Sequence, residues 1–260
     1  MCKNKMAILL IMTVLMGACN QNRTTQNNEF GTQNNEITVF DYLPSNTTGA
    51  VYKHKTYTLS YAEEYEQAEW VAYVLKESDI KNTDYKRPYF EIDPEILTGA
   101  AHWRNYKRSG YNKGHLCPAG DRRGSYEDYE ETFLTSNIAP QKYDFNAGIW
   151  NRLEQKVRYW AKGQDSLYVV TGGVLTPDLE TIGFENVAVP KYFYKILLSK
   201  DQKNMIGFLV PNEASEKPLY SFITSVDKIE QLTGIDFFPA LEDAIEDELE
   251  AKTDYTGWIF

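Results

Sequence analysis

The spacing of hydrophobic and polar positions predicts both helices and strands in the first part of the chain. Residues 57–59 resemble a short strand, and Ser60 to Glu63 match a capping box, which predicts a helix from Ser60 to about Lys76. Residues 132–140 read as a strand or an extended connection. A second helix is expected from Asp144 to Gly163, because apolar residues recur there at helical spacing.

The second half of the chain adds runs of β-branched and aromatic residues bounded by Gly, Pro, Asn and Asp, which are typical of strands. These strands are expected at 166–171, 192–198 and 205–210. A last helix is expected at 226–233, with Ser225 and Gly234 as its caps. Because helices and strands do not alternate regularly, we expect an α+β fold with a central antiparallel sheet flanked by helices.

The N-terminus has the pattern of an export signal. Lys3 and Lys5 precede an apolar run at 6–16 that is too short to span a bilayer. The sequence Leu-Met-Gly-Ala-Cys at 15–19 resembles the site where bacterial lipoproteins are cleaved and acylated. We therefore expect a lipoprotein signal peptide at 1–18 and a lipid on Cys19 that anchors the exported protein to the cell envelope. The alternative is an ordinary cleaved signal peptide with an incidental cysteine.

A polar tract follows the signal. Residues 20–36 are rich in Asn, Gln and Thr, and the sequence Thr-Gln-Asn-Asn-Glu occurs at 25–29 and again at 32–36. Such a segment has too little apolar surface to fold by itself. We expect a flexible tether at 19–50 and one folded domain at 51–260.

Charge is distributed unevenly along an acidic chain. The net charge is −10, and removal of Lys3 and Lys5 with the signal leaves 25 basic and 37 acidic residues, a net charge of −12. This charge argues against nucleic-acid binding by the whole surface. One segment opposes it, here called the basic island: Arg104, Lys107, Arg108, Lys113, Arg122 and Arg123. The acidic segment 241–254 is predicted to be a solvated face or tail.

Cysteine usage excludes a disulfide framework in the domain. Cys2 and Cys19 belong to the signal region, which leaves Cys117 as the remaining thiol. An intramolecular disulfide in the mature domain is therefore excluded. We expect Cys117 to be packed and not catalytic, since a free thiol in an oxidising compartment must be protected.

The chain offers three histidines as proton acceptors near neutral pH: His54, His102 and His115. The first two have no companions that suggest chemistry, and we interpret them as surface or packing residues. Lys113 lies two residues before His115 with Gly114 between them, so in an extended segment both side chains point to the same side. A base and a cation that face one cavity suit phosphodiester hydrolysis.

The helix expected from Asp144 carries two polar residues near its apolar stripe. At 100° per residue, Asn146 lies at the centre of the stripe and Glu154 roughly 80° from it, about 12 Å further along the axis. A hydrated ion could bridge the two side chains. The alternative is structural: Asn146 bonds to the backbone and Glu154 pairs with Arg158.

Three ordered blocks then identify a family resemblance. Residues 109–119 (Ser-Gly-Tyr-Asn-Lys-Gly-His-Leu-Cys-Pro-Ala), 136–141 (Ser-Asn-Ile-Ala-Pro-Gln) and 145–154 (Phe-Asn-Ala-Gly-Ile-Trp-Asn-Arg-Leu-Glu) resemble the DNA/RNA non-specific endonucleases of the ββα-metal superfamily. The resemblance covers roughly residues 50–240. It implies a ββα-metal active-site motif within the α+β fold.

The resemblance also implies roles for individual residues. His115 matches the general base that activates water, and Asn146 matches the direct protein ligand of one metal ion. Glu154 would hold the waters around that ion. The ion is expected to be Mg²⁺ or Mn²⁺, because an amide oxygen and waters form a hard oxygen set.

The remaining matches are Asn137, an active-site asparagine of the family, and Arg158, an arginine near the scissile phosphate. Arg87 matches a further arginine only roughly, because its loop differs by about a residue. The chain departs from the family at Lys113, where Asp-Arg-Gly-His is usual and Asn-Lys-Gly-His stands here. Lysine keeps the charge but lacks the bidentate fork, which affects substrate positioning more than activity itself.

The expected function is metal-dependent, sequence-non-specific cleavage of DNA and RNA to 5′-phosphate ends. An alternative of another class is a catalytically weak nucleic-acid-binding surface lipoprotein that uses the basic island. A phosphatase for small nucleotides is a third reading, disfavoured because no base-binding motif is present. The sequence leaves open whether an inhibitor protein restrains the enzyme.

Overall fold

The structure, a computed structural model, describes residues 39–260. The predicted signal peptide at 1–18, the lipidation site at Cys19 and most of the predicted tether lie outside these residues. Within residues 39–260, no helix combines the length and the apolar character needed to cross a membrane.

The segment 40–50 was expected to belong to the tether, but it packs against the domain. The rings of Phe40 and Tyr42 each lie 5.2 Å from the ring of Tyr168. The backbone N–H of Ser45 donates to the carbonyl oxygen of Asp236 at 2.8 Å. This segment is part of the folded domain, and the predicted tether boundary at residue 50 is wrong.

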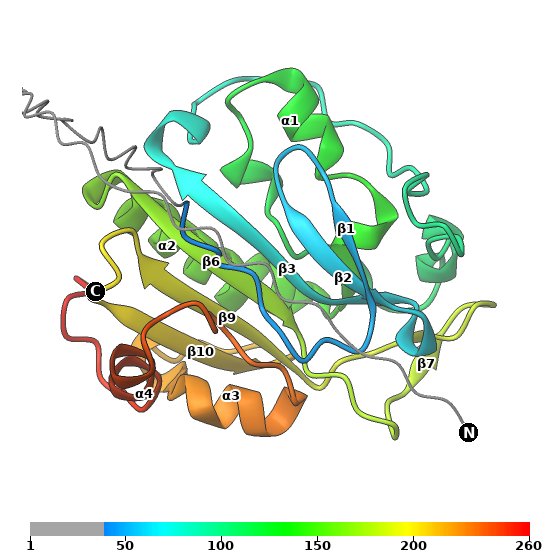
Figure 1. Cartoon of the computed structure of the whole chain (residues 1–260). Coiled ribbons are helices and arrows are strands. Elements are labelled where there is room, and N and C mark those ends of the chain that lie inside the picture. The colour runs from blue at the N-terminus through cyan, green and yellow to red at the C-terminus, as the bar shows by residue number, and fades with distance from the viewer. Residues whose placement is uncertain (1–38) are drawn as a thin grey trace, which may run out of the picture. The chain divides into compact units, whose positions relative to one another are not determined.

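A seven-stranded antiparallel sheet forms the centre of the described domain (Figure 1). In sheet order, its strands are β1 (Ala50–Lys53), β2 (Thr58–Ala62), β3 (Gln67–Lys76), β6 (Ser166–Gly173), β9 (Tyr192–Ser199), β10 (Met205–Pro211) and β11 (Ile223–Thr224). All neighbouring strands run antiparallel. The predicted fold class is confirmed, as are the three strands predicted in the second half of the chain.

The helix predicted from Ser60 to Lys76 is wrong, because this segment forms the end of β2 and the whole of β3. Val71, Tyr73 and Leu75 face one core cluster, whereas Trp70 and Ala72 face the other. β3 is a central strand that is covered on both sides, so residues 70–75 are all apolar. The alternation that normally marks a strand is then absent from the sequence.

Helices cover both faces of the sheet (Figure 1). The helix α2 (Asn151–Gly163) packs through Leu153 and Val157 on the face of the first core cluster. The helices α3 (Val226–Thr233) and α4 (Asp243–Glu250) contribute Ile229 and Leu249 to the second cluster, on the opposite face. A short helix, α1 (Tyr126–Glu131), precedes the strand at 138–141 in the chain. The two faces of the sheet are therefore separate environments.

The C-terminal helices differ in how well the sequence predicts them. Helix α3 has the predicted caps: the side chain of Ser225 accepts a hydrogen bond from the Lys228 backbone N–H, and Gly234 is left-handed with φ 75°. The acidic segment 241–254 was expected to be a solvated face or tail. Much of it forms α4, and both Leu249 and Glu250 are buried, so that expectation is wrong for its inner face.

A small ββα unit lies beside the main sheet. Strand β4 (Asn112–His115) pairs antiparallel with β5 (Ile138–Gln141), and α2 follows in the chain. Residues 132–133 form a turn, Leu134 makes an isolated bridge with Glu91, and 135–137 form a 3-10 segment, so the strand or extended connection predicted at 132–140 is a strand only at its end. The strands β7 (Thr181–Ile182) and β8 (Val187–Ala188) pair separately. The short 3-10 segments are η1 (Glu63–Tyr65), η2 (Glu77–Asp79), η3 (Trp103–Tyr106), η4 (Ala119–Asp121), η5 (Thr135–Asn137) and η7 (Leu219–Phe222).

Candidate active site

His115 is the last residue of β4 and is enclosed by aromatic rings. Its ring centroid lies 5.3 Å from that of Phe90 and 4.9 Å from that of Phe133. Burial, and then the nearby charge of Arg87, lower the pKa of His115 to about 3. The imidazole is therefore neutral near pH 7, as a general base requires. Its Nε2 atom is buried and has no hydrogen-bond partner among the described residues.

Gly114 sets the position of His115 through the close pairing of β4 and β5. Gly114 is paired with Ala139, and a Cβ at residue 114 would lie 2.1 Å from the side chain of Gln141. The side chain of Gln141 is fully buried, so it has little room to move. Residue 114 must therefore be glycine, because its backbone lies too close to the side chain of Gln141 to leave room for a Cβ atom.

Two cations lie on the same aromatic surface as His115. The guanidinium carbon of Arg87 is 5.9 Å from the ring centroid of Phe90 and 5.4 Å from that of Phe133. The Nζ atom of Lys113 is 5.4 Å from the ring centroid of Phe90. Partial burial and the charge of Arg87 lower the pKa of Lys113. Arg87 and Lys113 are thus both positioned beside the histidine.

The helix that carries Asn146 and Glu154 is not a regular α-helix from Asp144 onward, as the sequence predicted. Residues 145–150 form a π-helical turn, and Gly148 has φ −98° and ψ −107°, which marks a kink before α2. π-turns inside helices occur frequently at functional sites. Asp144 makes no side-chain capping bond. The angle estimated between Asn146 and Glu154 for an ideal helix therefore does not apply.

Glu154 lies in the first turn of α2 and is half-buried. Burial raises the pKa of its carboxyl to about 7, although the charges of Lys195 and Arg158 oppose this shift. The structural alternative, an ion pair between Glu154 and Arg158, is not the arrangement found. The Nη1 atom of Arg158 instead lies 2.7 Å from Oδ1 of Asp121. The carboxyl of Glu154 therefore has no ion-pair partner among the described residues, and the nearby positive charges do not offset the effect of its burial.

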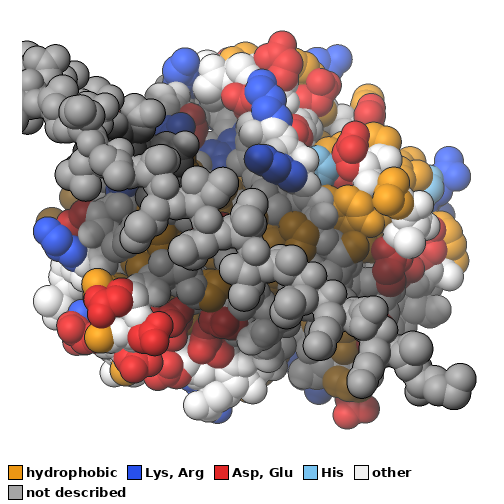
Figure 2. Space-filling view, in the orientation of Figure 1, with side chains coloured by type: hydrophobic (Ala, Val, Ile, Leu, Met, Phe, Trp, Pro, Cys, Tyr) orange, Lys and Arg blue, Asp and Glu red, His pale blue; other side chains and the backbone are white. Residues whose placement is uncertain are grey.

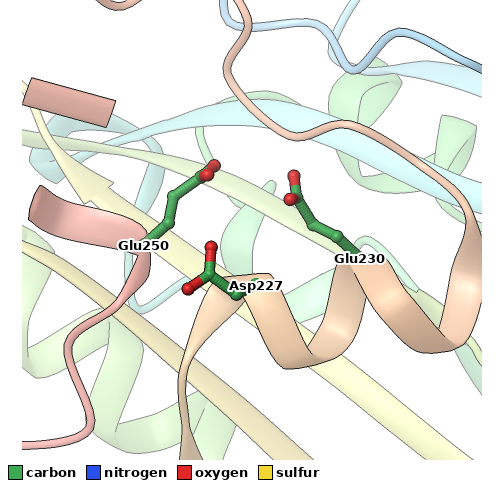
Figure 3. Close-up of side chains that lie close together, drawn as sticks. All are labelled: Asp227, Glu230 and Glu250. Atoms are coloured by element: carbon green, nitrogen blue, oxygen red, sulfur yellow. The ribbon is translucent and has the colours of Figure 1, made fainter. Parts of the chain in front are cut away.

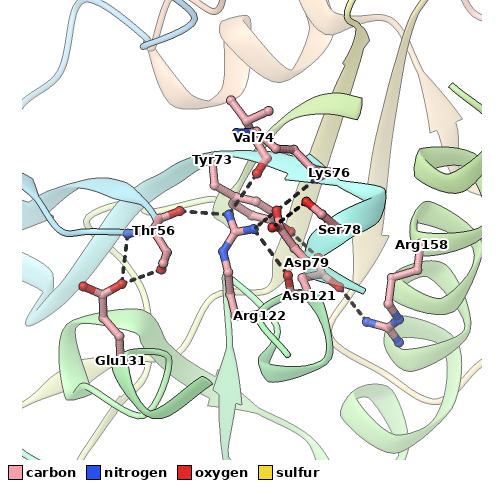
Figure 4. A network of polar contacts seen from close by, with 10 residues as sticks. All are labelled: Thr56, Tyr73, Val74, Lys76, Ser78, Asp79, Asp121, Arg122, Glu131 and Arg158. Atoms are coloured by element: carbon pink, nitrogen blue, oxygen red, sulfur yellow. Dashed lines mark hydrogen bonds and ion pairs between the residues drawn. The ribbon is translucent and has the colours of Figure 1, made fainter. Parts of the chain in front are cut away.

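Arg158 is held by a buried polar network behind the site (Figure 4). Asp121 is 1 % exposed, and its Oδ2 atom accepts a hydrogen bond of 2.8 Å from the hydroxyl of Tyr73. A Cβ at Gly120 would lie 2.8 Å from Nη1 of Arg158, so the backbone passes directly beside the guanidinium. Asp121 and Gly120 therefore fix the direction of Arg158.

Arg122 corrects the interpretation of the basic island. This residue is 3 % exposed, and its guanidinium donates to the backbone carbonyls of Thr56 and Val74 (Figure 4). Its ion pair is with Asp79, at 3.3 Å. Arg122 therefore joins the turn between β1 and β2 to β3 and to the segment after β3, and it does not present charge to a ligand.

Asn137, like Lys113, does not line the cavity that holds the other predicted site residues. It is fully buried; its Oδ1 accepts from the Cys117 backbone N–H, and its Nδ2 donates to the carbonyls of Cys117 and Thr132. All the bonds of its amide group thus go to the backbone. The contacts give Asn137 a positioning role, since it holds the turn before β5 against the strand of His115.

The remaining candidates from the sequence occupy structural positions. His54 is buried, with Nε2 3.0 Å from Oδ2 of Asp93, and the side chain of His102 accepts from the Arg104 backbone N–H. Cys117 is buried, and its thiol is free. Burial raises the pKa of its thiol to about 12, which suits a packing residue.

One cavity of about 360 Å³ brings most of the predicted site together. Its lining includes Arg87, His115, Asn146, Glu154 and Arg158. These residues come from a loop, a strand of the ββα unit and a helix, and they are separated by up to 71 positions in the chain. A larger cavity of about 1050 Å³ near Trp160 contains none of the predicted site residues. The smaller cavity is the candidate active site.

The sequence interpretation missed several residues of this lining, including Asn151, Tyr129 and Gly120. Asn151 could have been found, because it lies three residues before Glu154 and seven before Arg158, which places all three on one face of α2. Arg123 also lines the cavity; it was predicted only as part of the basic island. Tyr129 and Gly120 carried no comparable signal.

Comparison with known proteins places the chain among nucleases. A family model for DNA/RNA non-specific endonuclease matches residues 35–244. The mitochondrial nuclease EXOG of Danio rerio is 35% identical over 210 residues, which cover 73% of this chain and 61% of that protein. A nuclease of Nostoc sp. is 31% identical over 214 residues, covering 76% of each protein. This chain thus spans about three fifths of the length of the EXOG relatives.

A solved structure shares the fold as well. A chain from the crystal structure of the EndoG/EndoGI complex superposes with a TM-score of 0.70 and is 32% identical in sequence. The match covers 75% of this chain and 87% of that one. The likeness therefore covers most of the described domain.

Proposed function

Because this chain belongs to the DNA/RNA non-specific endonuclease family, we propose that it is a metal-dependent endonuclease that hydrolyses phosphodiester bonds in both DNA and RNA. The observation that carries this proposal is the shared cavity of His115, Asn146, Glu154 and Arg158. A neutral base, oxygen donors and a cation then face one space. Phosphodiester hydrolysis needs these three kinds of group together.

His115 acts as the base. With its pKa lowered to about 3, its imidazole has a free nitrogen lone pair at neutral pH and accepts a proton from the attacking water. The new oxygen–phosphorus bond forms as the bond to the sugar 3′ oxygen breaks, which leaves a 5′-phosphate. The enclosing rings of Phe90 and Phe133 keep the imidazole in one orientation.

The basic residues of the cavity stabilise the phosphate. Arg158 is fixed by Asp121, and Arg87 rests against two aromatic rings, so both guanidinium groups are held in place before substrate binds. Lys113 adds a positive charge at the side of Phe90. These basic side chains would bind the phosphate backbone of the nucleic acid and not its bases, so cleavage depends little on base sequence.

The site residues fit a hard divalent ion, Mg²⁺ or Mn²⁺. Glu154 has a pKa raised to about 7 by burial, which a nearby cation would reverse, and Asn146 provides an amide oxygen in the same cavity. Asn146 would bind the ion directly, and Glu154 would hold its water shell. When bound, the ion supplies positive charge to offset the charge that develops on the phosphate and leaving oxygens.

Digestion of supercoiled plasmid and of structured RNA, with and without Mg²⁺ or Mn²⁺, tests this function. We expect both polymers to be degraded with metal and neither with excess EDTA. The variant His115→Ala should cleave about 10²–10⁴-fold more slowly than the parent. The variant His102→Ala, at a position outside the cavity, should keep the parent's rate. Binding of DNA without any cleavage would support the alternative, a nucleic-acid-binding lipoprotein on the same fold.

We further propose that the protein is exported and anchored to the cell envelope by a lipid on Cys19. The support is the sequence at 15–19 and the apolar run before it. The change Cys19→Ser should move the protein from the membrane to the soluble fraction without altering its specific activity, because one acylated cysteine is the anchor proposed. Fractionation of cells that express each form checks this, and retention of the serine variant in the membrane would refute it.

A further inference from the structure

Three carboxyl groups meet between the two C-terminal helices (Figure 3). Asp227 and Glu230 lie one turn apart on α3, and Glu250 is the last residue of α4. One carboxylate oxygen from each of the three lies within 4.8 Å of the others. Figure 3 shows the three groups facing a common space. The cluster lies on the side of the sheet opposite α2, away from the candidate active site.

Glu250 is the residue that a packing role does not explain. It is 6 % exposed, and its Oε1 atom is buried with no hydrogen-bond partner among the described residues. It also stands at the C-terminal end of α4, where the helix dipole disfavours a negative charge. The last turn of α4 contains no basic residue. A buried carboxylate with no compensation is costly to fold, so its retention needs a reason.

The surroundings add negative charge from each packed element. Glu246 lies one turn before Glu250 on α4, and its Oε1 atom is likewise buried without a partner. Asp236 approaches from the loop after α3, and burial and these neighbours raise the pKa of Glu250 to about 9. Glu230 has one partner, the Phe237 backbone N–H, which donates to Oε1 at 2.8 Å. No ion pair joins Asp227, Glu230 or Glu250 to a lysine or arginine in the described part of the chain.

Acidic side chains also dominate the surface around this cluster. Figure 2 shows them gathered at the end of the molecule that carries α3 and α4. The ion pair that lies nearest to Glu250 in the sequence joins Lys252 to Glu248 at 3.1 Å. It lies on the exposed side of α4 and not in the cluster. A mobile cation would therefore be drawn to this end of the protein.

We propose that Asp227, Glu230 and Glu250 bind a divalent cation of the calcium type, which joins α3 to α4. Carboxylates are the preferred ligands of calcium, which accepts six to eight oxygens in flexible geometry, whereas Mg²⁺ requires a near-ideal octahedron and retains its waters. Bound calcium would supply the positive charge that the buried carboxyl of Glu250 lacks and would fasten α4 to α3. This site is structural, and it does not depend on the proposed nuclease activity.

Thermal unfolding of the full chain tests the site, followed by circular dichroism after removal of metals with EDTA and dialysis. Calcium at about 100 times its Kd should raise the Tm of the parent by about 5–10 °C. Glu250→Gln and, as a second variant, Asp227→Asn should lose most of this rise. The matched control Glu248→Gln changes a carboxyl on the same helix that is 74% exposed, and it should keep the full rise.

The candidate active site provides a second control. Asn146→Ala should show the same calcium-dependent rise as the parent, because it changes only the proposed catalytic metal site. The inference is overturned if calcium does not raise the Tm of the parent, if Glu250→Gln retains the rise, or if Asn146→Ala abolishes it. An equal rise with Mg²⁺ would overturn the assignment to calcium. Loss of nuclease activity in Asn146→Ala with an intact rise separates the two proposals.

Discussion

Arg158 reaches the candidate active site from α2, but a residue far away in the chain decides where its guanidinium points. Asp121 lies 2.7 Å from Nη1 of Arg158 and is itself oriented by the hydroxyl of Tyr73. The pair is nearly enclosed, so little water competes for the interaction. We therefore propose that Asp121 is a positioning residue, which acts on the substrate through Arg158.

The change Asp121→Asn keeps the shape of the side chain but removes its charge. We expect kcat/KM to fall about tenfold, because Arg158 is no longer held toward the phosphate. The Mg²⁺ concentration for half-maximal rate should stay unchanged, since the oxygen donors of the site are untouched. Tyr73→Phe is the control: it removes one hydrogen bond to Asp121 but leaves the ion pair, so its loss should be smaller. An equal loss in both variants would show general damage to the core instead.

At the residue scale, the sequence identifies side chains that share a short motif but not those that meet through the fold. His115, Asn146 and Glu154 were predicted from blocks of neighbouring residues, and they line one cavity. The ion pair of Arg158 with Asp121 joins positions 37 residues apart, and no local sequence pattern predicts it. The buried state of Arg122 was missed for the same reason, because a charged residue beside other charged residues reads as surface.

Among the elements, β-branched and aromatic strands bounded by turn residues and helices with clear caps were the most predictable. Helix α3 was found with both of its caps, and β6, β9 and β10 were recognised from their β-branched and aromatic composition. Strand β3 was mistaken for a helix, because apolar residues on both faces hide its period of two. The kink at Gly148 was also missed, since a π-turn has no distinct spacing of apolar residues.

The pairing of β4 with β5 can be tested through its glycine. Gly114→Ala should lower the stability of the domain by about 1–3 kcal/mol, because its Cβ would overlap the buried side chain of Gln141. The double change Gly114→Ala with Gln141→Ala should recover part of that loss, since the second change removes the overlapping atoms. Urea unfolding of the three proteins measures this. If the double variant is no more stable than Gly114→Ala, the constraint on Gly114 is not the contact with Gln141.

The proposed function requires a local concentration of positive charge that binds a polyanion despite the protein's net charge of −10. Arg87, Arg123 and Arg158 line the active-site cavity, whereas the acidic cluster lies with α3 and α4 on the other face of the sheet. This separation keeps the two charge regions apart. The sequence indicated the imbalance, but which arginines face the cavity follows only from the fold.

Salt should therefore weaken substrate binding strongly. If two or more phosphates are contacted, the KM for long DNA should rise at least about tenfold between 50 and 200 mM salt. Arg123→Gln should make this dependence shallower, because Arg123 lines the cavity. Arg104→Gln, which changes a basic-island residue stacked on Trp103 outside that cavity, should not. A KM that is independent of salt would mean that these arginines do not bind the phosphates.

We propose that one cavity combines a histidine base with a separate metal site on the helix. Initial rates measured against Mg²⁺ concentration for the parent, His115→Ala and Asn146→Ala test it most directly. His115→Ala should lower the maximal rate by about 10²–10⁴ and keep the half-maximal Mg²⁺ concentration of the parent. Asn146→Ala should raise that concentration at least about tenfold and also lower the maximum, with Glu154→Gln following the same pattern. Parental Mg²⁺ dependence in Asn146→Ala would contradict the assignment of the metal site to this helix.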